Sequence, residues 1–368
     1  MTTLRKLPAE LALNGNVPRK HAHQLSSRRV LSHTFFLGVA LVVMFAVYVL
    51  LGSYTVTIPD FFTIVINHLT GGEKIPGASF IVMEHKLPRA VVGTMIGIAF
   101  GLAGALFQTM LRNPLASPDI IGISYGASAA AVTAIVIFGA SGAVVSWAAL
   151  GGALGVAAII YAISRGAGSC GGSRGNAAGN RLILAGVGIA AALHAVVNFL
   201  MTRADIRTAA DVLVWLNGSL NSANWERTGI LMASLLVLVP AVIILAGPLR
   251  ILELGDDAAA GLGIRVNATR LGLVLTAVGL AASATAAAGP VAFVAFLAGP
   301  IARRIVRKPS LPASAFTGAL IVLAADFFAS NIAPAILDGT VLPVGVITGA
   351  LGAPFLLWLL VTSNRKEA

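Results

Sequence analysis

The chain has 368 residues, of which 57% are hydrophobic and only 11% are charged, and its formal net charge is +11. This composition excludes a water-soluble enzyme, because about a quarter of the residues in soluble domains are charged. The single cysteine, Cys170, excludes an intramolecular disulfide framework and any metal site made of several cysteines. At about 20 residues per crossing, the apolar residues suffice for about ten transmembrane helices.

Residues 1–33 form a basic, polar tail that is predicted to lie in the cytoplasm. The apolar run after it is too long for a secretory signal and is expected to stay in the bilayer. Apolar runs bounded by Gly, Pro, Asn and charge predict ten spans, at about 34–52, 90–111, 119–138, 143–163, 182–202, 229–247, 270–288, 291–302, 311–330 and 341–362. The predicted fold class is therefore an all-α polytopic membrane protein, with a transmembrane domain at 34–363 and a short C-terminal tail at 364–368. The run at 291–302 is short for a crossing.

The distribution of Lys and Arg predicts the orientation of the spans. With ten spans, most of these residues fall in loops on the same side as the tail 1–33, and loops rich in Lys and Arg stay in the cytoplasm. Both termini are therefore expected to face the cytoplasm. The cations are scattered through short loops rather than gathered in one patch, so no nucleic acid is expected as a partner.

Few groups that could do chemistry lie within the spans. Asp326 and His194 are ionisable residues deep in predicted spans, where such side chains are costly and suggest function. The other histidines show no zinc-binding spacing, and no lysine follows a glycine loop of the form GxxxxGK[ST]. We therefore expect no catalytic residue, metal ligand or cofactor, and ATP-driven transport would need another polypeptide. The rival classes are a secondary transporter driven by an ion gradient, a membrane scaffold and an intramembrane enzyme.

The loop between the second and third spans has the sequence LRNPLASPDIIG, residues 111–122. Its two prolines forbid a continuous helix, and Ser117 followed by Pro118 is typical of a helix start. The loop is either a tight turn between helices or a constriction at the inner mouth, in which Asn113 and Leu115 narrow a pathway.

A second polar segment, residues 249–266, is too polar to cross the membrane. Its apolar residues recur every four positions, on one face of a short helix that two glycines bracket and two aspartates favour at its N-terminus. Such a helix either fits a groove on a partner protein or lies on the bilayer surface. The residues concerned are Leu254, Gly255, Asp256, Asp257, Ala258, Leu262 and Gly263.

Several longer stretches carry a resemblance to a known family. They are LPRAVVGTMIGIAFGLAGALFQTMLRNPLASPDIIGISYGA (87–127), RLILAGVGI (181–189), WLNGSLNSANWE (215–226), LELGDDAAAGLGI (252–264), AAAGPVAFVAF (286–296) and LPVGVITGALGAPFLLWLL (342–360). In this order they resemble the FecCD-type permeases, the transmembrane subunits of ABC importers for iron-siderophores, haem and cobalamin. The resemblance covers nearly the whole membrane part of the chain.

The resemblance implies a type II ABC importer permease with ten helices in a bacterial inner membrane. It implies a dimer with a second copy or a related permease, two ATPase subunits that use ATP and Mg on the cytoplasmic side, and a solute-binding protein outside. By the same resemblance Asn113, Leu115 and Asn180 fall at a cytoplasmic gate. The segment from Leu254 to Gly263 falls on the helices that couple the permease to its ATPase.

Two further sets of residues have competing interpretations. Lys86 and Arg89 lie at the outer end of the second span, and the resemblance implies that they attract acidic residues of the binding protein. Snorkelling to the membrane interface is the alternative. In the same span Gly101, Gly104 and Gln108 are predicted to line the transport pathway, and close packing of helices is the alternative.

Two positions depart from the pattern of the family. Gly299-Pro300 stands where relatives usually have Pro-His, so the end of the eighth span is expected to bend differently. Ser330 stands where cobalamin permeases have an outward arginine, which disfavours cobalamin. The stretches 110–122, 215–225 and 252–263 resemble family members that carry enterobactin-like siderophores. The resemblance therefore implies a ferric siderophore of the catecholate class as cargo, with haem or cobalamin as the alternative.

Overall fold

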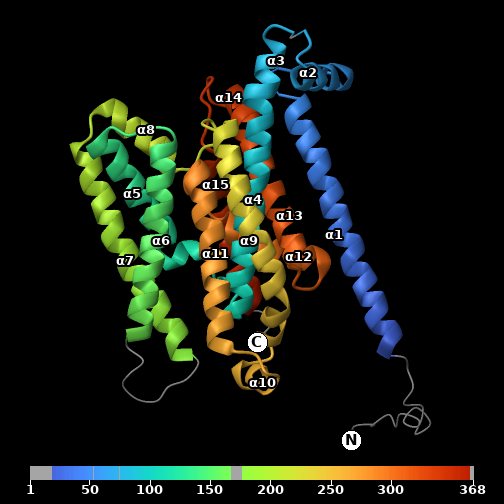
Figure 1. Ribbon diagram of the computed structural model, residues 1–368, viewed down its shortest axis with the longest axis vertical. Helices are drawn as coiled ribbons and strands as arrows, with labels where there is room; N and C mark the ends of the chain where they lie inside the picture. The colour runs from blue at the N-terminus through green and yellow to red at the C-terminus, as the bar shows by residue number, and fades with distance from the viewer. Residues whose placement is uncertain (1–18, 53, 74, 167–175, 365–368) are drawn as a thin grey trace, which may run out of the picture.

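The computed structural model describes residues 19–52, 54–73, 75–166 and 176–364, and every regular element in these ranges is helical. Figure 1 shows long helices running side by side. Ten of the helices in the described ranges match the predicted spans, namely α1 (Arg19–Leu50), α4 (Leu87–Met110), α5 (Ile123–Phe138), α6 (Ala143–Gly166), α7 (Asn176–Arg203), α9 (Trp225–Leu252), α11 (Val266–Ala288), α12 (Val294–Val306), α13 (Leu311–Phe327) and α15 (Val344–Asn364). The predicted all-α fold is confirmed.

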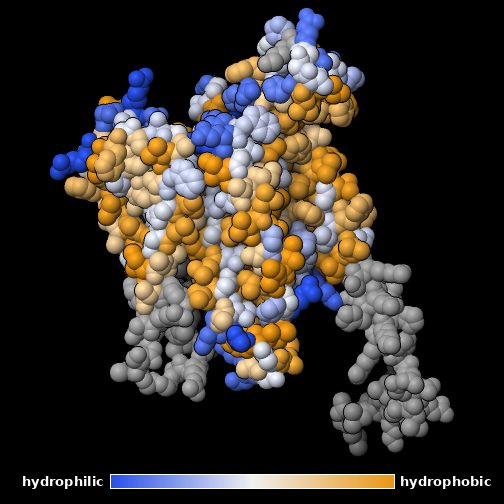
Figure 2. Space-filling model, in the orientation of Figure 1, coloured by the Kyte–Doolittle hydropathy of each residue, from blue (hydrophilic) through white to orange (hydrophobic). Residues whose placement is uncertain are grey.

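Length and composition fit a membrane-spanning bundle. Seven of the described helices, or continuous helical stretches, are long and apolar enough to cross a membrane, and α5 and α15 are shorter apolar helices. Figure 2 shows apolar side chains around the middle of the molecule and hydrophilic ones towards both its upper and its lower end. The helix α1 begins at Arg19, earlier than the predicted boundary at residue 34, because no proline interrupts the polar residues before the apolar run.

The second predicted span, α4, is the centre of the bundle. Most of its residues are buried, and it packs against α9, α11, α12 and α13. Its glycines permit this, because a Cβ at Gly101 would overlap the carbonyl oxygen of Ser314 in α13, and one at Gly104 would overlap that of Ala295 in α12. The helices α5, α6 and α7 form a second group, which joins the first through contacts of α6 and α5 with α11.

The eighth span is short, as its sequence predicts. The helix α12 has 13 residues and begins after Phe293, whose φ of 64° is left-handed. The chain therefore crosses only part of the bundle as a helix, and Gly289 and Val291 of the irregular segment before α12 are buried.

Three glycines from distant parts of the chain meet next to this segment, at the glycine junction of Gly218, Gly289 and Gly345. Gly345 N donates a hydrogen bond to Gly218 O (3.3 Å), and Ser219 N donates one to Ala288 O (2.8 Å). A Cβ at Gly218 would lie 2.7 Å from the carbonyl oxygen of Pro290, too close for any real side chain. The junction thus fixes the ends of three helices by direct contact between backbones.

Shorter helices between the long ones complete the molecule. They are α2 (Ile58–Thr70), α3 (Ala78–Phe80), η2 (Ile81–Lys86), η3 (Pro118–Ile121), α8 (Ile206–Leu216), α10 (Asp256–Gly261), η5 (Phe328–Ile332) and α14 (Ala333–Ile336). Side-chain oxygens cap the two longest, since Thr57 accepts from Asp60 N before α2 and Asp205 accepts from Thr208 N before α8. Figure 1 places α2 and α8 at one end of the bundle and α10 at the other. We refer to these as the α2 end and the α10 end.

Candidate functional site

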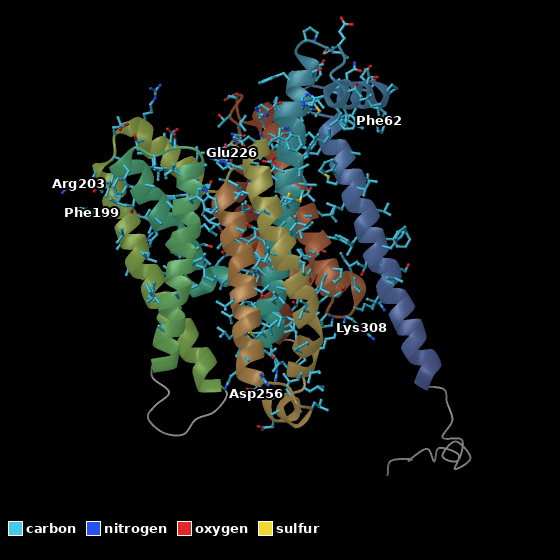
Figure 3. The ribbon with its side chains drawn as sticks, in the orientation of Figure 1. Phe62, Phe199, Arg203, Glu226, Asp256 and Lys308 are labelled. Atoms are coloured by element: carbon cyan, nitrogen blue, oxygen red, sulfur yellow. The ribbon has the colours of Figure 1, made fainter. Side chains whose placement is uncertain are left out.

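The polar segment predicted at 249–266 forms a short helix at the α10 end. Gly255 and Gly263 bracket α10 with φ values of 118° and 83°, which favour glycine. One face is pinned to the bundle, because Ala259 is buried and Asp256 forms a salt bridge of 2.9 Å to Arg270 of α11. Figure 3 labels Asp256 at this lower end.

The opposite face of α10 is apolar and uncovered in the described chain. Leu254 is 68% exposed, Leu262 is 63% exposed, and Ala258 between them is exposed as well. This is the face that the spacing in the sequence predicts. An ordered helix that presents two large apolar side chains is suited to enter a groove on another protein.

The loop at 111–122 is an ordered turn. Asn113 stabilises it, because its Oδ1 accepts a hydrogen bond from Leu115 N (2.8 Å) and its carbonyl oxygen accepts one from Ala116 N (3.1 Å). Arg112 has a φ of 49°. Its guanidinium donates a hydrogen bond to Leu252 O (2.7 Å) at the end of α9. The predicted gate loop is therefore tied directly to the last turn before α10.

The other half of this loop contacts α7. The hydroxyl groups of Ser124 and Ser117 donate to the Asp119 carboxylate, and burial raises the pKa of that carboxyl. Gly122 packs so closely that a Cβ there would lie 3.0 Å from Gly186 O of α7. The third predicted gate residue, Asn180, lies in α7, but its side chain is outside the part of the chain that the structure describes.

Arg89 departs from the predicted exposed pair. The residue is only 8% exposed, and its guanidinium makes two hydrogen bonds to Asp326 of α13, from Nε to Oδ2 (2.7 Å) and from Nη2 to Oδ1 (2.8 Å). The hydroxyl of Tyr48 in α1 also donates to Asp326. The prediction of an outward-facing cation is wrong at Arg89, because a buried guanidinium needs a carboxylate and Asp326 supplies it.

Lys86 is also engaged within the chain. Its Nζ donates to the carbonyl oxygens of Val49 (3.1 Å), Leu51 (2.8 Å) and Tyr54. A lysine here satisfies carbonyl groups that the end of α1 leaves without helical partners. Lys86 therefore stabilises the turn after α1, and its ammonium is not a free charge at the α2 end.

The predicted pathway residues of α4 face neighbouring helices. Gly101 and Gly104 lie against α13 and α12, as described above, and Gln108 is buried and donates from Nε2 to Phe296 O (3.1 Å). A Cβ at Gly299 would overlap Gln108 Oε1, so the unusual glycine provides room for the glutamine. Helix packing, the alternative, accounts for Gly101 and Gly104 within this chain, and the pathway assignment of the three residues stays a prediction.

A polar group lies on α7 and α5 facing outward from the chain. The rings of His194 and Tyr125 meet edge to face with centroids 5.8 Å apart, and Asn198 Nδ2 lies 3.4 Å from His194 Nδ1. All three residues are exposed. Sequence reasoning noted His194 but missed Tyr125 and Asn198, although two polar residues four apart in an apolar helix mark one face. Within the described ranges no group of His, Cys, Asp and Glu could hold a metal ion.

Comparison with known proteins gives consistent matches along the chain. The model of the FecCD transport family matches residues 40–362. The Fe(3+)-citrate import system permease protein YfmE of Bacillus subtilis is 36% identical over 346 residues, which cover 92% of this chain and 98% of that protein.

Two permeases of one system in Escherichia coli also match. The ferric enterobactin transport system permease protein FepG is 35% identical over 68% of this chain and 74% of its own length, and its counterpart FepD is 37% identical over 66% and 72%. A solved structure described as an inward-facing conformation of a putative metal-chelate type ABC transporter has a TM-score of 0.74 at 23% identity, covering 89% of this chain and 98% of the other. The chain belongs to the FecCD transport family.

Proposed function

We propose that the chain is the permease subunit of an ATP-driven importer that moves a ferric siderophore from a solute-binding protein to the cytoplasm. As a transport protein of the FecCD family, it is a multi-pass membrane protein and not itself an enzyme. The observation that carries the proposal is the uncovered apolar face at α10, formed by Ala258 of the helix and by Leu254 and Leu262 beside its two ends. This face would dock into an ATPase subunit, and that subunit would bind the ATP and Mg that drive transport.

The contacts of α10 supply a route for coupling. Arg270 holds the start of α10 to α11, and Arg112 holds the gate loop to the last turn of α9. A displacement of α10 by the ATPase would therefore reach both the loop with Asn113 and Leu115 and the two long helices beside it. Alternating access needs such a link between the site of ATP hydrolysis and the site that opens and closes.

The orientation follows from the same assignment. The α10 end would face the cytoplasm, together with both termini, and the α2 end would face the binding protein. The positively charged end of α12, with Arg303, Arg304, Arg307 and Lys308, supports this orientation, because Lys and Arg favour the cytoplasmic side. The membrane would be the bacterial cytoplasmic membrane.

The second permease in the importer is a copy of this chain or a related protein. FepG and FepD are two permeases named for one transport system, and both match this chain. This favours a related permease as the partner, with the transport pathway between the two.

The names of relatives support a ferric chelate as cargo. They include ferric citrate and ferric enterobactin systems, which favours a siderophore, and the catecholate class is our specific proposal. Cobalamin and haem are the alternative cargoes. Ser330 offers no cation, because a serine hydroxyl is uncharged, and this disfavours cobalamin on the argument above.

Substitution of the exposed face of α10 tests the proposal. We expect Leu262→Asp, and separately Asp256→Lys or Gly263→Trp, to abolish co-purification of the ATPase while the permease still inserts into the membrane. Leu262→Asp is the sharpest variant, because its side chain makes no buried contact that folding needs. Leu213→Asp, at a half-exposed apolar position of α8 at the other end, is the control.

Two results would contradict the assignment. Retained co-purification of the ATPase with Leu262→Asp would remove the coupling role of α10. Uptake of ferric enterobactin by vesicles that contain the permease and the binding protein but no ATPase would favour a secondary transporter driven by an ion gradient.

A further inference from the structure

The exposed polar group on α7 lies near the middle of a membrane span. The apolar part of α7 that can cross a membrane runs from Leu184 to Arg203, and His194 is close to its centre. Figure 3 labels Phe199 and Arg203 on α7 near the α2 end of the bundle. His194 and Asn198 come before them in the sequence and so lie further along α7 towards the α10 end. These side chains are at a depth where lipid provides no hydrogen-bond partners.

Lipid contact does not account for this surface. Placing His and Asn side chains against hydrocarbon costs free energy, and polar residues at such depth face protein or water. The exposed surface of α9 is different, because Leu236, Val237 and Ile244 there are large, apolar and strongly exposed, as expected of side chains that meet lipid. The polar group on α7 therefore lies on a face that lipid does not cover.

This face lies beside the gate loop. Gly122, the last residue of the loop, packs against the backbone of α7 with its nearest side-chain neighbour at Ala190, one helical turn before His194. On the other side, Ser124 donates to Asp119 of the loop and directly precedes Tyr125. Both helices that carry the polar group are thus anchored to the same loop, and a shift of the loop shifts the group.

We propose that Tyr125, His194 and Asn198 form a polar station of the transport pathway, next to the gate loop, that donates hydrogen bonds to the oxygen atoms of a ferric chelate. The inference rests on the proposed function for the identity of the cargo. The phenol, imidazole and amide all provide O–H or N–H donors, and oxygen-rich chelates present acceptors.

Water access to the station is tested without any cargo. In a Cys170→Ser background, His194→Cys is reacted with a charged, membrane-impermeant methanethiosulfonate in the assembled importer in vesicles. Val237→Cys, which is 71% exposed near the middle of α9, is the matched control for lipid. Only the thiolate reacts, and hydrocarbon does not stabilise it, so we expect His194→Cys to react at least about tenfold faster. Equal rates would overturn the placement of the station in a water-filled pathway.

Contact with cargo is tested by uptake of radioactive iron supplied as ferric enterobactin and, in parallel, as ferric citrate. We expect His194→Ala and Asn198→Ala each to lower uptake about tenfold, the effect of losing about 1.4 kcal/mol of hydrogen bonding. His194→Gln, which retains a donor, should restore most of the uptake, and ATP hydrolysis should stay within about twofold of wild type because the coupling helix is untouched. Val237→Ala is the control.

The outcomes separate the station from the proposed function. If wild-type vesicles take up iron with ATP but the alanine variants do so at the wild-type rate, the station is wrong and the importer assignment stands. If wild-type vesicles show no ATP-dependent uptake of either chelate, the proposed cargo is wrong. In that case the thiol reactivity still decides whether the polar group lines a pathway.

Discussion

The buried ion pair between α4 and α13 allows a quantitative prediction. The Arg89 side chain is 10% exposed and that of Asp326 is 0% exposed, with N–O distances of 2.7 and 2.8 Å. Replacing Arg89 by Met leaves a buried carboxylate without its partner. Loss of one member of such a pair costs about 3–5 kcal/mol of unfolding free energy. Arg89→Met is therefore expected to destabilise the permease by this amount.

The double variant distinguishes a lost pair from lost packing. Arg89→Met combined with Asp326→Leu removes both charges and fills the space with apolar atoms of similar size. Replacements of this kind are often neutral or stabilising by about 1–4 kcal/mol. We therefore expect the double variant to be more stable than Arg89→Met alone. Tyr48→Phe, which removes only the hydroxyl donor to Asp326, should cost about 1.5–3 kcal/mol.

Unfolding of the purified permease in mixed micelles, followed by tryptophan fluorescence as sodium dodecyl sulfate is titrated, measures these differences. The expected order of stability is wild type and double variant above Tyr48→Phe, with Arg89→Met lowest. Stability of Arg89→Met within about 1 kcal/mol of wild type would refute the reasoning, since it would mean that the pair is solvated. The reasoning would also be refuted if the double variant lost as much unfolding free energy as its two substitutions lose separately, added together.

Two further predictions concern packing and pH. Gly104→Ala should prevent correct folding, because its Cβ overlaps a carbonyl of α12, whereas Gly151→Ala, in open space, should fold normally; size-exclusion profiles after detergent extraction compare the two. Hydrogen bonds from Thr208 lower the pKa of the Asp205 carboxyl in the folded protein. The stabilisation of α8 by this cap is therefore fully present above the unfolded pKa of about 3.9, and it is lost as the pH falls through the lower pKa of the folded protein. The rate of amide hydrogen exchange in α8, corrected for the intrinsic effect of pH on exchange, should therefore rise in acid. Asp205→Asn should keep the cap without this pH dependence, and identical pH profiles for the two proteins would contradict the cap.

Much of the membrane architecture could be predicted from hydrophobicity alone. The ten predicted spans correspond to helices because apolar runs of this length have one stable structure in a bilayer. The short helices α2 and α8 were missed because they lie outside such runs. Their signals were local: Thr57 before Pro59 and Asp60 marks the start of α2, and Asp205 three residues before Thr208 marks that of α8.

The parts of the candidate sites that are contiguous in the sequence could be predicted, and the parts that depend on distant residues could not. The short helix α10 could be predicted because its glycines, aspartates and apolar spacing are contiguous in the sequence. The burial of Arg89 could not, because its partner Asp326 is 237 positions away and only the folded chain brings them together. The same holds for Gln108, whose neighbours Phe296 and Gly299 lie on a helix far along the sequence.

The glycine junction limits where the molecule can bend. Because Gly218, Gly289 and Gly345 hold backbone against backbone, the final turn of α8, the final turn of α11 and the first turn of α15 form one rigid body. A movement that widens this mouth of the bundle must therefore use hinges elsewhere. The helix α8 then moves with the junction as a unit, together with the part of α5 that packs against its buried residue Val212.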